Sequence, residues 1–237
     1  MNITNLHSRH ALFLDYDGTL APIQENPDTV FMSDYKIDIL LKTEQRMGGA
    51  LAVISGRDVR DLALRVPDRI WRAGGHGADI CPPGQMPPED SQPAPEALVQ
   101  AAEALCRKFY GVRLEKKGPV LALHYRLNPN VGDVLAQAVG ALLSGQETYC
   151  LQAGKMVLEL RPFGVHKGMA VRGLMKQAPF LDRVPVMVGD DTTDEDAMAV
   201  CLEMGGVAIR VGDGASIAPL RLSDSHAVWR WLSEALE

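Results

Sequence analysis

Short apolar segments alternate with amphipathic helical segments at both ends of this sequence. The apolar runs cover residues 11–14, 50–54, 70–73, 184–188 and 207–211. Predominantly apolar runs of this length are typical of strands buried on both faces. Strands that alternate with helices form a parallel sheet with helices on both sides. The sequence therefore predicts an α/β core built around a parallel sheet.

The helices of this core are indicated by apolar stripes at helical spacing. They are expected at 33–47, 59–66, 166–177, 193–204 and 228–236. Ser33 is a suitable N-cap for the first helix, and Gly48 and Gly49 are suited to end it.

The middle of the chain follows a different pattern. Residues 82–95 contain six prolines and read as a linker. Beyond it we expect a helix–strand–strand unit that occurs twice, with helices at 96–110 and 131–143 and strands at 112–115, 120–126, 147–151 and 156–160. Ala153 and Gly154 would form the turn between the last two strands. The chain is thus predicted to have a core of 1–94 and 163–237 and an inserted α+β domain of 95–162.

Composition excludes several classes of protein. The net charge is −6 and the acidic and basic residues are interspersed, so we expect neither a nucleic acid nor a membrane as partner. The four cysteines are widely spaced, which suits reduced thiols better than disulfides or a zinc site. Residues 1–10 lack a signal-peptide pattern and no apolar run approaches a spanning length. We expect a cytoplasmic monomer.

The segment DYDGTL, residues 15–20, follows the first predicted strand. Sites in parallel sheets form at the carboxyl ends of strands, so Asp15 and Asp17 would project into such a site. Two carboxylates this close favour a cation or a shared proton. A turn in which the aspartates cap backbone groups is the alternative. A calcium loop is excluded because Leu20 and Asn26 stand where it needs glycine and glutamate.

The segment GDDTTDE, residues 189–195, follows another buried strand. Thr192 or Thr193 with an acid three residues later predicts a capping box, which could account for Asp194 as a helix-start residue. Asp190 and Asp191 precede that cap and are left without this structural explanation. Together with Asp15 and Asp17 they predict an all-oxygen site, which selects Mg²⁺ over zinc.

Two further segments offer groups that bind anions. Ser55, Gly56 and Arg57 join the second strand to a helix, where a hydroxyl and unpaired N–H groups can bind phosphate. Lys167 begins a helix, where the helix dipole disfavours a cation unless carboxylates or a phosphate face it. The alternatives are an ordinary serine cap and an exposed lysine.

In chain order, the segments 15–20, 55–57, Lys167 and 189–195, placed as described, resemble the haloacid dehalogenase superfamily of phosphohydrolases. The resemblance implies a Rossmann-like parallel-sheet haloacid dehalogenase core with an inserted α+β cap domain. It further implies that Asp15 is the nucleophile and that Asp17 protonates the leaving group and then activates water. Ser55 and Lys167 would hold the phosphoryl oxygens. Mg²⁺ would be bound by Asp15, Asp190 and the backbone carbonyl of Asp17, with Asp191 and Asp194 behind these ligands.

Other segments are similar to the trehalose-6-phosphate phosphatase family: 15–23, 75–78, 115–118, 121–126, 154–162 and 166–168. Asp79 departs from the glutamate that this family usually has. The resemblance implies a phosphosugar substrate bound by Ser55, Gly56, Arg57, His76, Lys117, His124, Arg126, Lys155 and Glu159. Taken alone, Lys155 and Glu159 could equally be charged residues on the solvated face of a strand.

Three other functions remain open from the sequence. A sucrose-phosphate or mannosyl-phosphoglycerate phosphatase would use the same core. A phosphosugar mutase would share the acyl-phosphate chemistry but return the phosphoryl group to sugar. A signalling receiver domain also phosphorylates an aspartate, but it has no place for the inserted domain, and a stable phosphoaspartate is better served without Asp17.

Overall fold

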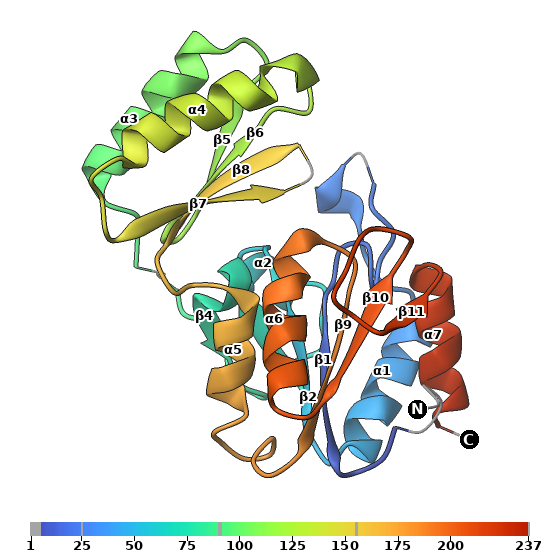
Figure 1. Ribbon diagram of the computed structural model, residues 1–237. Helices are drawn as coiled ribbons and strands as arrows, with labels where there is room; N and C mark the ends of the chain where they lie inside the picture. The colour runs from blue at the N-terminus through green and yellow to red at the C-terminus, as the bar shows by residue number, and fades with distance from the viewer. Residues whose placement is uncertain (1–5, 25, 90–91, 155, 237) are drawn as a thin grey trace. The chain divides into compact units, whose positions relative to one another are not determined.

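The computed structural model describes residues 6–24, 26–89, 92–154 and 156–236. The chain divides into two compact units (Figure 1). The first, called the core, is Met1–Pro87 with His166–Glu237, and the second, called the inserted domain, is Pro88–Val165. These bounds lie a few residues from the boundaries expected from the sequence.

A sheet that is parallel except at one edge forms the centre of the core. Its strands are β1 (His10–Leu14), β2 (Leu51–Ile54), β3 (Trp71–Gly74), β4 (Asp79–Cys81), β9 (Val184–Gly189), β10 (Val207–Val211) and β11 (Leu220–Leu222). Within the described residues their spatial order is β11-β10-β9-β1-β2-β3-β4, and only β4 pairs antiparallel. The predicted α/β class with a parallel sheet is confirmed.

Helices cover both faces of this sheet. They are α1 (Asp34–Arg46), α2 (Val59–Ala63), α5 (Lys167–Leu174), α6 (Thr192–Glu203) and α7 (Ser225–Glu234), with short 3₁₀ turns at Pro27–Thr29 and Gly75–Gly77. Figure 1 shows α1 and α7 together on one side and α5 and α6 on the other. The short α2 follows β2 and contributes Leu62 to the same apolar cluster as α1 and α7.

Alternate residues of each central strand enter two separate hydrophobic clusters. Leu12 and Leu14 of β1 pack with α1 and α7, whereas Ala11 and Phe13 pack with α5 and α6. This alternation follows from the pleat of a strand, and it explains why the sequences of the central strands β1 and β2 are almost entirely apolar. The order of strands also reverses at β1, because the chain adds β2 on one side and β9 on the other. Ligand sites in such sheets form at this reversal.

Two short edge strands were not predicted. β4 and β11 each have three residues, and each contains a charged residue: Asp79 in β4 and Arg221 in β11. Edge strands are buried less completely than central ones, so their sequences lack the continuous apolar run that reveals a central strand.

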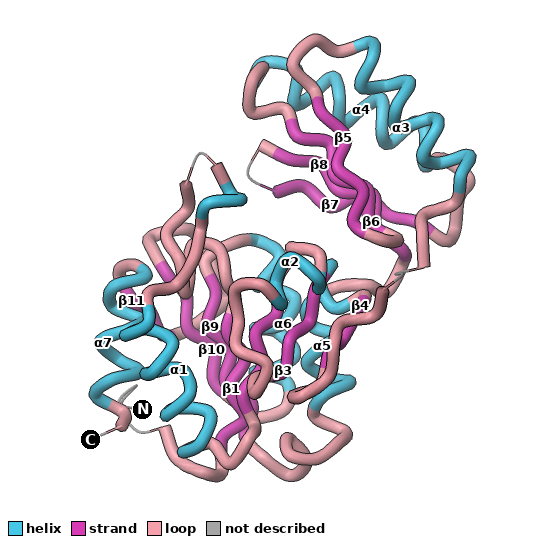
Figure 2. The backbone as a smooth tube through the Cα atoms, turned by 180° about the vertical axis from the view of Figure 1, so that it is seen from behind, coloured by secondary structure: helices cyan, strands magenta, loops and turns pink. Residues whose placement is uncertain are grey.

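The inserted domain contains a four-stranded antiparallel sheet with two helices (Figure 2). Its elements are α3 (Glu96–Lys108), β5 (Arg113–Lys117), β6 (Val120–His124), α4 (Gly132–Leu143), β7 (Tyr149–Gly154) and β8 (Val157–Pro162), with a 3₁₀ turn at Pro129–Val131. The sheet order is β5-β6-β8-β7. Leu121, Leu123, Leu158 and Leu160 pack against α3 and α4 in one cluster. The predicted pair of helix–strand–strand units is confirmed.

Strand ends in the inserted domain differ from the prediction. β6 ends at His124 rather than at Arg126, and Arg126 is exposed in the following turn. β7 continues through Ala153 and Gly154, so these two residues pair with β8 instead of forming the turn. Small residues can occupy a strand as well as a turn, and only pairing with a partner strand decides between them.

Within the described residues, no helix has both the length and the apolar character needed to cross a membrane.

Candidate active site

The loops that follow β1 and β9 lie side by side in the core. β1 and β9 pair in parallel with Leu14 opposite Val188, and the Asp15 amide donates to the Val188 carbonyl at 3.0 Å. Gly18 has a φ of +90°, and a Cβ built on it would lie 2.2 Å from a carboxylate oxygen of Asp190. A side chain at position 18 would therefore collide with Asp190, which explains the need for glycine there.

Three carboxylates from these loops form a buried cluster. Oxygen atoms of Asp15, Asp190 and Asp194 all lie within 4.8 Å of one another. Lys167 Nζ lies 2.6 Å from Asp15 Oδ1 and 2.6 Å from Asp194 Oδ1. The side chains of Lys167 and Asp194 are 3% and 0% exposed. The lysine at the start of α5 therefore bridges two carboxylates rather than facing solvent.

Burial and charge shift the ionisation of this cluster. Burial raises the pKa of Asp15 well above its usual value, Lys167 opposes the rise, and the Asp194 and Asp190 carboxylates add to it. Burial alone would lower the pKa of Lys167, but Asp15 and Asp194 outweigh that effect and raise it. The lysine is consequently held as an ammonium group between two acids.

The cluster fits a divalent cation. Three carboxylates and one ammonium group carry a net charge of 1 − 3 = −2 when ionised. Asp15 Oδ2 is buried and has no hydrogen-bond partner among the described residues. A buried charged oxygen without a partner is unfavourable unless a ligand satisfies it. Oxygen donors with this net charge suit Mg²⁺.

Asp17 is held apart from this cluster by an arginine. Arg57 Nε donates to Asp17 Oδ2 at 2.6 Å, and Arg57 Nη2 donates to Asp17 Oδ1 at 2.7 Å. This two-bond fork fixes the plane of the carboxylate. The sequence suggested Arg57 as a residue that contacts substrate, and the pairing with Asp17 was not foreseen.

The segments after β2 and β3 are tied together beside Arg57. The Ser55 hydroxyl accepts from the Arg57 amide at 3.1 Å, and the His76 amide donates to the Ser55 carbonyl at 2.9 Å. His76 is buried and has a φ of +58°, which is uncommon outside glycine. A Cβ on Gly56 would lie 2.7 Å from the His76 ring, so glycine lets the ring approach.

The capping prediction for α6 was placed one residue too far along. Asp191 is the N-cap, and it forms a capping box with Asp194 three residues later. Asp191 therefore does have a structural role, contrary to the sequence argument. Asp194 Oδ2 accepts the amides of Asp190 and Asp191 at 2.9 Å each, while its Oδ1 binds Lys167. One buried carboxylate thus shapes the loop and orients the lysine.

Arg210 supports the same loop and was missed in the sequence. It lies on β10, opposite Gly189, and donates to the Asp191 carbonyl at 3.0 Å and to Glu195 Oε1 at 3.1 Å. Glu195 Oε2 in turn accepts the Ile217 amide at 3.0 Å. An arginine within an apolar strand was the available signal, because such a residue needs a buried partner.

In the inserted domain, three of the predicted substrate-binding residues lie on one face of the sheet. Lys117 Nζ lies 3.6 Å from Glu159 Oε1 and 3.6 Å from Glu115 Oε2. His124 Nε2 lies 2.7 Å from Glu115 Oε2. Glu159 and Gln152 are register partners, and Gln152 accepts from Arg161 at 2.8 Å. The face opposite the helices therefore carries a connected polar network.

Two other predicted residues remain to be placed. Arg126 is exposed in the turn after β6, where the strand has already ended. Lys155 lies outside the described residues.

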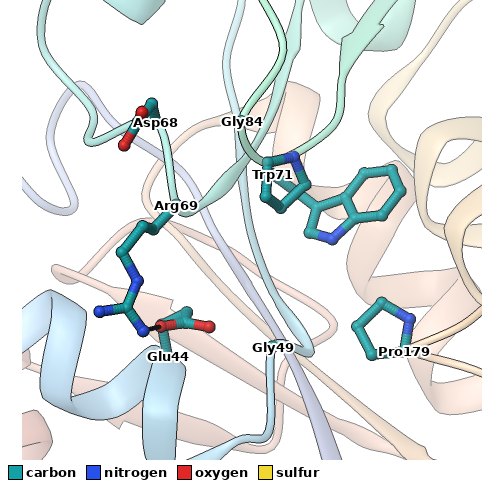
Figure 3. Close-up of a pocket in the computed structure, with 8 residues that line it drawn as sticks. Glu44, Gly49, Asp68, Arg69, Trp71, Gly84 and Pro179 are labelled. Carbon is teal, nitrogen blue, oxygen red and sulfur yellow. Dashed lines mark hydrogen bonds and ion pairs between the residues drawn. The ribbon is translucent and has the colours of Figure 1, made fainter.

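A separate pocket lies on the core, near the amino ends of β2 and β3 (Figure 3). Its volume is about 560 Å³, and it is lined by Glu44, Gly49, Asp68, Arg69, Trp71, Pro83, Gly84 and Pro179. Arg69 and Glu44 are paired across it at 2.8 Å. Of the predicted site residues that the structure describes, none lines this pocket.

Known proteins with a similar sequence identify the family. The profile of the trehalose-phosphatase family matches residues 13–225. The trehalose-6-phosphate phosphatase of Escherichia coli is 38% identical over 231 residues, covering 96% of this chain and 86% of that protein. A probable trehalose-phosphate phosphatase of Sinorhizobium fredii is 37% identical, covering 85% of this chain and 77% of its own. This chain belongs to the trehalose-phosphatase family.

Solved structures agree on the fold. The C-terminal domain of the Candida albicans trehalose-6-phosphate phosphatase has a TM-score of 0.82 at 23% identity, covering 97% of this chain and 92% of that one. A phosphatase of the haloalkanoate (HAD) superfamily from Bacteroides thetaiotaomicron has a TM-score of 0.63 at 15% identity, covering 95% of each chain. These structures confirm the haloacid dehalogenase fold. The class of phosphoric monoester hydrolases is confirmed by the family model and the sequence relatives.

Proposed function

We propose that this protein hydrolyses trehalose 6-phosphate to trehalose and phosphate with Mg²⁺ and through an aspartyl-phosphate intermediate. The observation that carries the proposal is the buried cluster in which one Asp15 oxygen, beside Lys167, has no hydrogen-bond partner among the described residues. The substrate is suggested by the names of the relatives, two of which are similar over most of this chain.

The chemistry requires a nucleophile held in a neutralised site. An Asp15 oxygen attacks phosphorus, the new O–P bond forms, and the bond from phosphorus to the sugar oxygen breaks. Asp17 gives its proton to that sugar oxygen. Water then attacks phosphorus of the acyl phosphate, Asp17 takes the proton from the water, and Asp15 leaves as a carboxylate. Lys167 and the Ser55 hydroxyl bind the phosphoryl oxygens throughout.

Mg²⁺ would be held by Asp15, Asp190 and the backbone carbonyl of Asp17, with Asp191 and Asp194 behind them. When bound, it supplies the positive charge that lets an anionic nucleophile approach an anionic phosphate. The net charge of the cluster supports this assignment. The Asp17 carboxylate is not part of that cluster, which agrees with a role for it in proton transfer.

Recognition of the sugar is proposed for the polar face of the inserted domain. Lys117, His124 and Glu159 are connected donors and acceptors of the kind that bind hydroxyl groups. Arg126 and Lys155 are retained as candidates, together with the core residues Gly56, Arg57 and His76. Monomeric state and cytoplasmic location also stay predictions.

The test is phosphate release from a panel of sugar phosphates. With Mg²⁺ present, trehalose 6-phosphate should exceed sucrose 6-phosphate, glucose 6-phosphate and mannosyl-phosphoglycerate in kcat/KM. Preference for another member of the panel would overturn the substrate but keep the phosphatase. Transfer of phosphate between sugar positions without its release would instead establish a mutase.

A further inference from the structure

Four charged side chains of the core form a chain of alternating sign: Asp17, Arg57, Asp61 and Arg65. We propose that Asp61 and Arg65 are positioning residues that act through Arg57 to hold Asp17, the proposed general acid, in its working orientation. This inference rests on the proposed function and adds residues that neither bind phosphate nor hold a metal.

Arg57 donates hydrogen bonds to carboxylates on two of its edges. Its Nε and Nη2 atoms bind the two oxygens of Asp17, at 2.6 and 2.7 Å, and its Nη1 atom binds Asp61 Oδ2 at 2.8 Å. The Arg57 side chain is only 10% exposed. A planar guanidinium group that is bonded along two edges cannot rotate without breaking a charged hydrogen bond. Asp61 therefore restrains Arg57, and Arg57 restrains the Asp17 carboxylate.

Arg65 anchors the far end of the chain and returns it to the loop of Asp17. Arg65 Nη2 binds Asp61 Oδ1 at 2.6 Å, and Arg65 Nε binds Asp61 Oδ2 at 3.1 Å. Arg65 Nη1 donates to the Val30 carbonyl at 2.7 Å, and the same carbonyl accepts from the Tyr16 hydroxyl at 3.3 Å. Tyr16 directly precedes Asp17, so the side-chain path and the backbone path both fix the same loop.

The arrangement suits a group that must donate a proton in one direction. When Asp17 is protonated, its carbonyl oxygen can still accept from Arg57 while the hydroxyl oxygen carries the proton to the leaving sugar oxygen. Loss of the Asp61 carboxylate would free Arg57 to move with Asp17. Asp61 itself contacts arginines, so its effect would be transmitted and not direct.

The inference is tested by how strongly kcat/KM depends on the leaving group of the substrate. An alcohol needs protonation to leave, whereas 4-nitrophenol leaves without it. We would measure kcat/KM of Asp61→Asn, with Mg²⁺, for 4-nitrophenyl phosphate, phenyl phosphate and a simple alkyl phosphate. General acid catalysis is worth roughly 10²–10⁴-fold, so partial misplacement should lower the rate on alkyl phosphate about 10- to 100-fold. The rate on 4-nitrophenyl phosphate should change less than about threefold.

Hydrolysis of the acyl phosphate does not enter this measurement. The value of kcat/KM reports the steps up to release of the alcohol, and the acyl phosphate is the same for every substrate. A loss of folding would lower all three rates together, so a steeper dependence on the leaving group separates positioning from a structural role. Arg57→Lys is a second variant, because lysine keeps the charge but cannot form the fork.

Asp58→Asn is the matched control. Asp58 is the N-cap of α2, the helix that contains Asp61, and it accepts from Arg60 Nε at 2.8 Å. Asparagine is also a good N-cap. Its leaving-group dependence should equal that of the wild type. Asp17→Asn removes the proposed general acid itself, so it should show the steepest dependence of kcat/KM on the leaving group.

The outcomes are distinct. If Asp17→Asn lowers all three rates equally, the acid role in the proposed function fails. If Asp17→Asn steepens the dependence but neither Asp61→Asn nor Arg57→Lys does, the positioning inference is overturned and the proposed function stands. The inference is supported if kcat/KM depends more steeply on the leaving group in Asp17→Asn, Asp61→Asn and Arg57→Lys. In Asp58→Asn this dependence should equal that of the wild type.

Discussion

The core and the inserted domain hold their charged side chains in different ways. In the core, Lys167 is 3% exposed and lies 2.6 Å from each of two buried acids. In the inserted domain, Lys117 is 12% exposed, Glu115 is 42% exposed, and the nitrogen–oxygen distance between them is 3.6 Å. Tight burial suits reacting groups, whose positions must not change during the reaction. The longer contacts of Lys117, at 3.6 Å to Glu115 and to Glu159, suit recognition because they can be exchanged for contacts with hydroxyl groups, although the same face also holds the 2.7 Å contact between His124 and Glu115.

The largest effect is expected from the nucleophile in the core. Asp15→Asn should remove hydrolysis of both trehalose 6-phosphate and 4-nitrophenyl phosphate, by about 10⁵-fold or more, because amide nitrogen and oxygen do not form the acyl phosphate. Steady-state phosphate release measures this loss. Asp213→Asn, an exposed aspartate of the core, is the control and should keep full activity. Substantial residual activity in Asp15→Asn would show that another group attacks phosphorus.

Removal of the metal should also act on both substrates alike. Chelation is expected to lower both rates by about 10²-fold or more, and added Mg²⁺ should restore them, since both reactions use the carboxylate cluster. Thermal unfolding followed by circular dichroism should show a midpoint that rises with Mg²⁺ concentration. Full activity after chelation would overturn the metal assignment. A loss confined to the sugar substrate would mean that the metal does not act at the reacting phosphate.

Changes on the polar face of the inserted domain should separate the two substrates. Glu159→Ala and Lys117→Ala should lower kcat/KM for trehalose 6-phosphate about 10- to 100-fold, because hydroxyl groups of the bound sugar lose their partners. Hydrolysis of 4-nitrophenyl phosphate should change less than about twofold. Arg126→Ala and Lys155→Ala, measured in the same way, test the two remaining candidates for sugar binding.

Lys116→Ala is the control for this set. Lys116 neighbours Lys117 on β5 but binds Glu103 of α3 at 2.8 Å, on the helix side of the sheet. It should leave both substrates unaffected. Equal losses on both substrates in Glu159→Ala would mean that this residue supports the fold, and the comparison between core and inserted domain would fail.

The smallest effect is expected for stability as a function of pH. Burial would raise the pKa of Glu115, but the bonds from His124 and Lys117 outweigh it and lower that pKa. A lowered folded pKa stabilises the protein above the unfolded pKa of about 4.3, and this stabilisation is lost as pH falls through the folded value. Partly exposed pairs contribute about 0.2–1 kcal/mol, so Glu115→Gln should lower the unfolding midpoint by about 1–3 °C at pH 7. The difference should shrink as pH falls through the lowered pKa of Glu115, and a difference that stays constant as this group is protonated would contradict an origin in its charge.

Much of the candidate site could be predicted because its parts follow buried strands. A parallel sheet brings the ends of β1 and β9 together, so Asp15 and Asp190 could be expected in one place from the positions of two apolar runs. The partner of Asp17 could not be predicted in this way. Arg57, Asp61 and Arg65 have the alternating charges and four-residue spacing of a helical pattern, but that pattern predicts only a solvated helix face.

Apart from the edge strands β4 and β11, the sequence alone determined the order of strands and helices along the chain, the insertion between them and the family to which the chain belongs. These follow from apolar periodicity and from local motifs, which are read within a few residues. Tertiary structure decided which charged groups face one another: Lys167 with Asp15 and Asp194, Arg57 with Asp17, and Arg210 with Glu195. It also decided that Ala153 and Gly154 belong to a strand. The physical reason is that a buried charge or a small residue takes its role from partners far along the chain, and those partners are assembled only by folding.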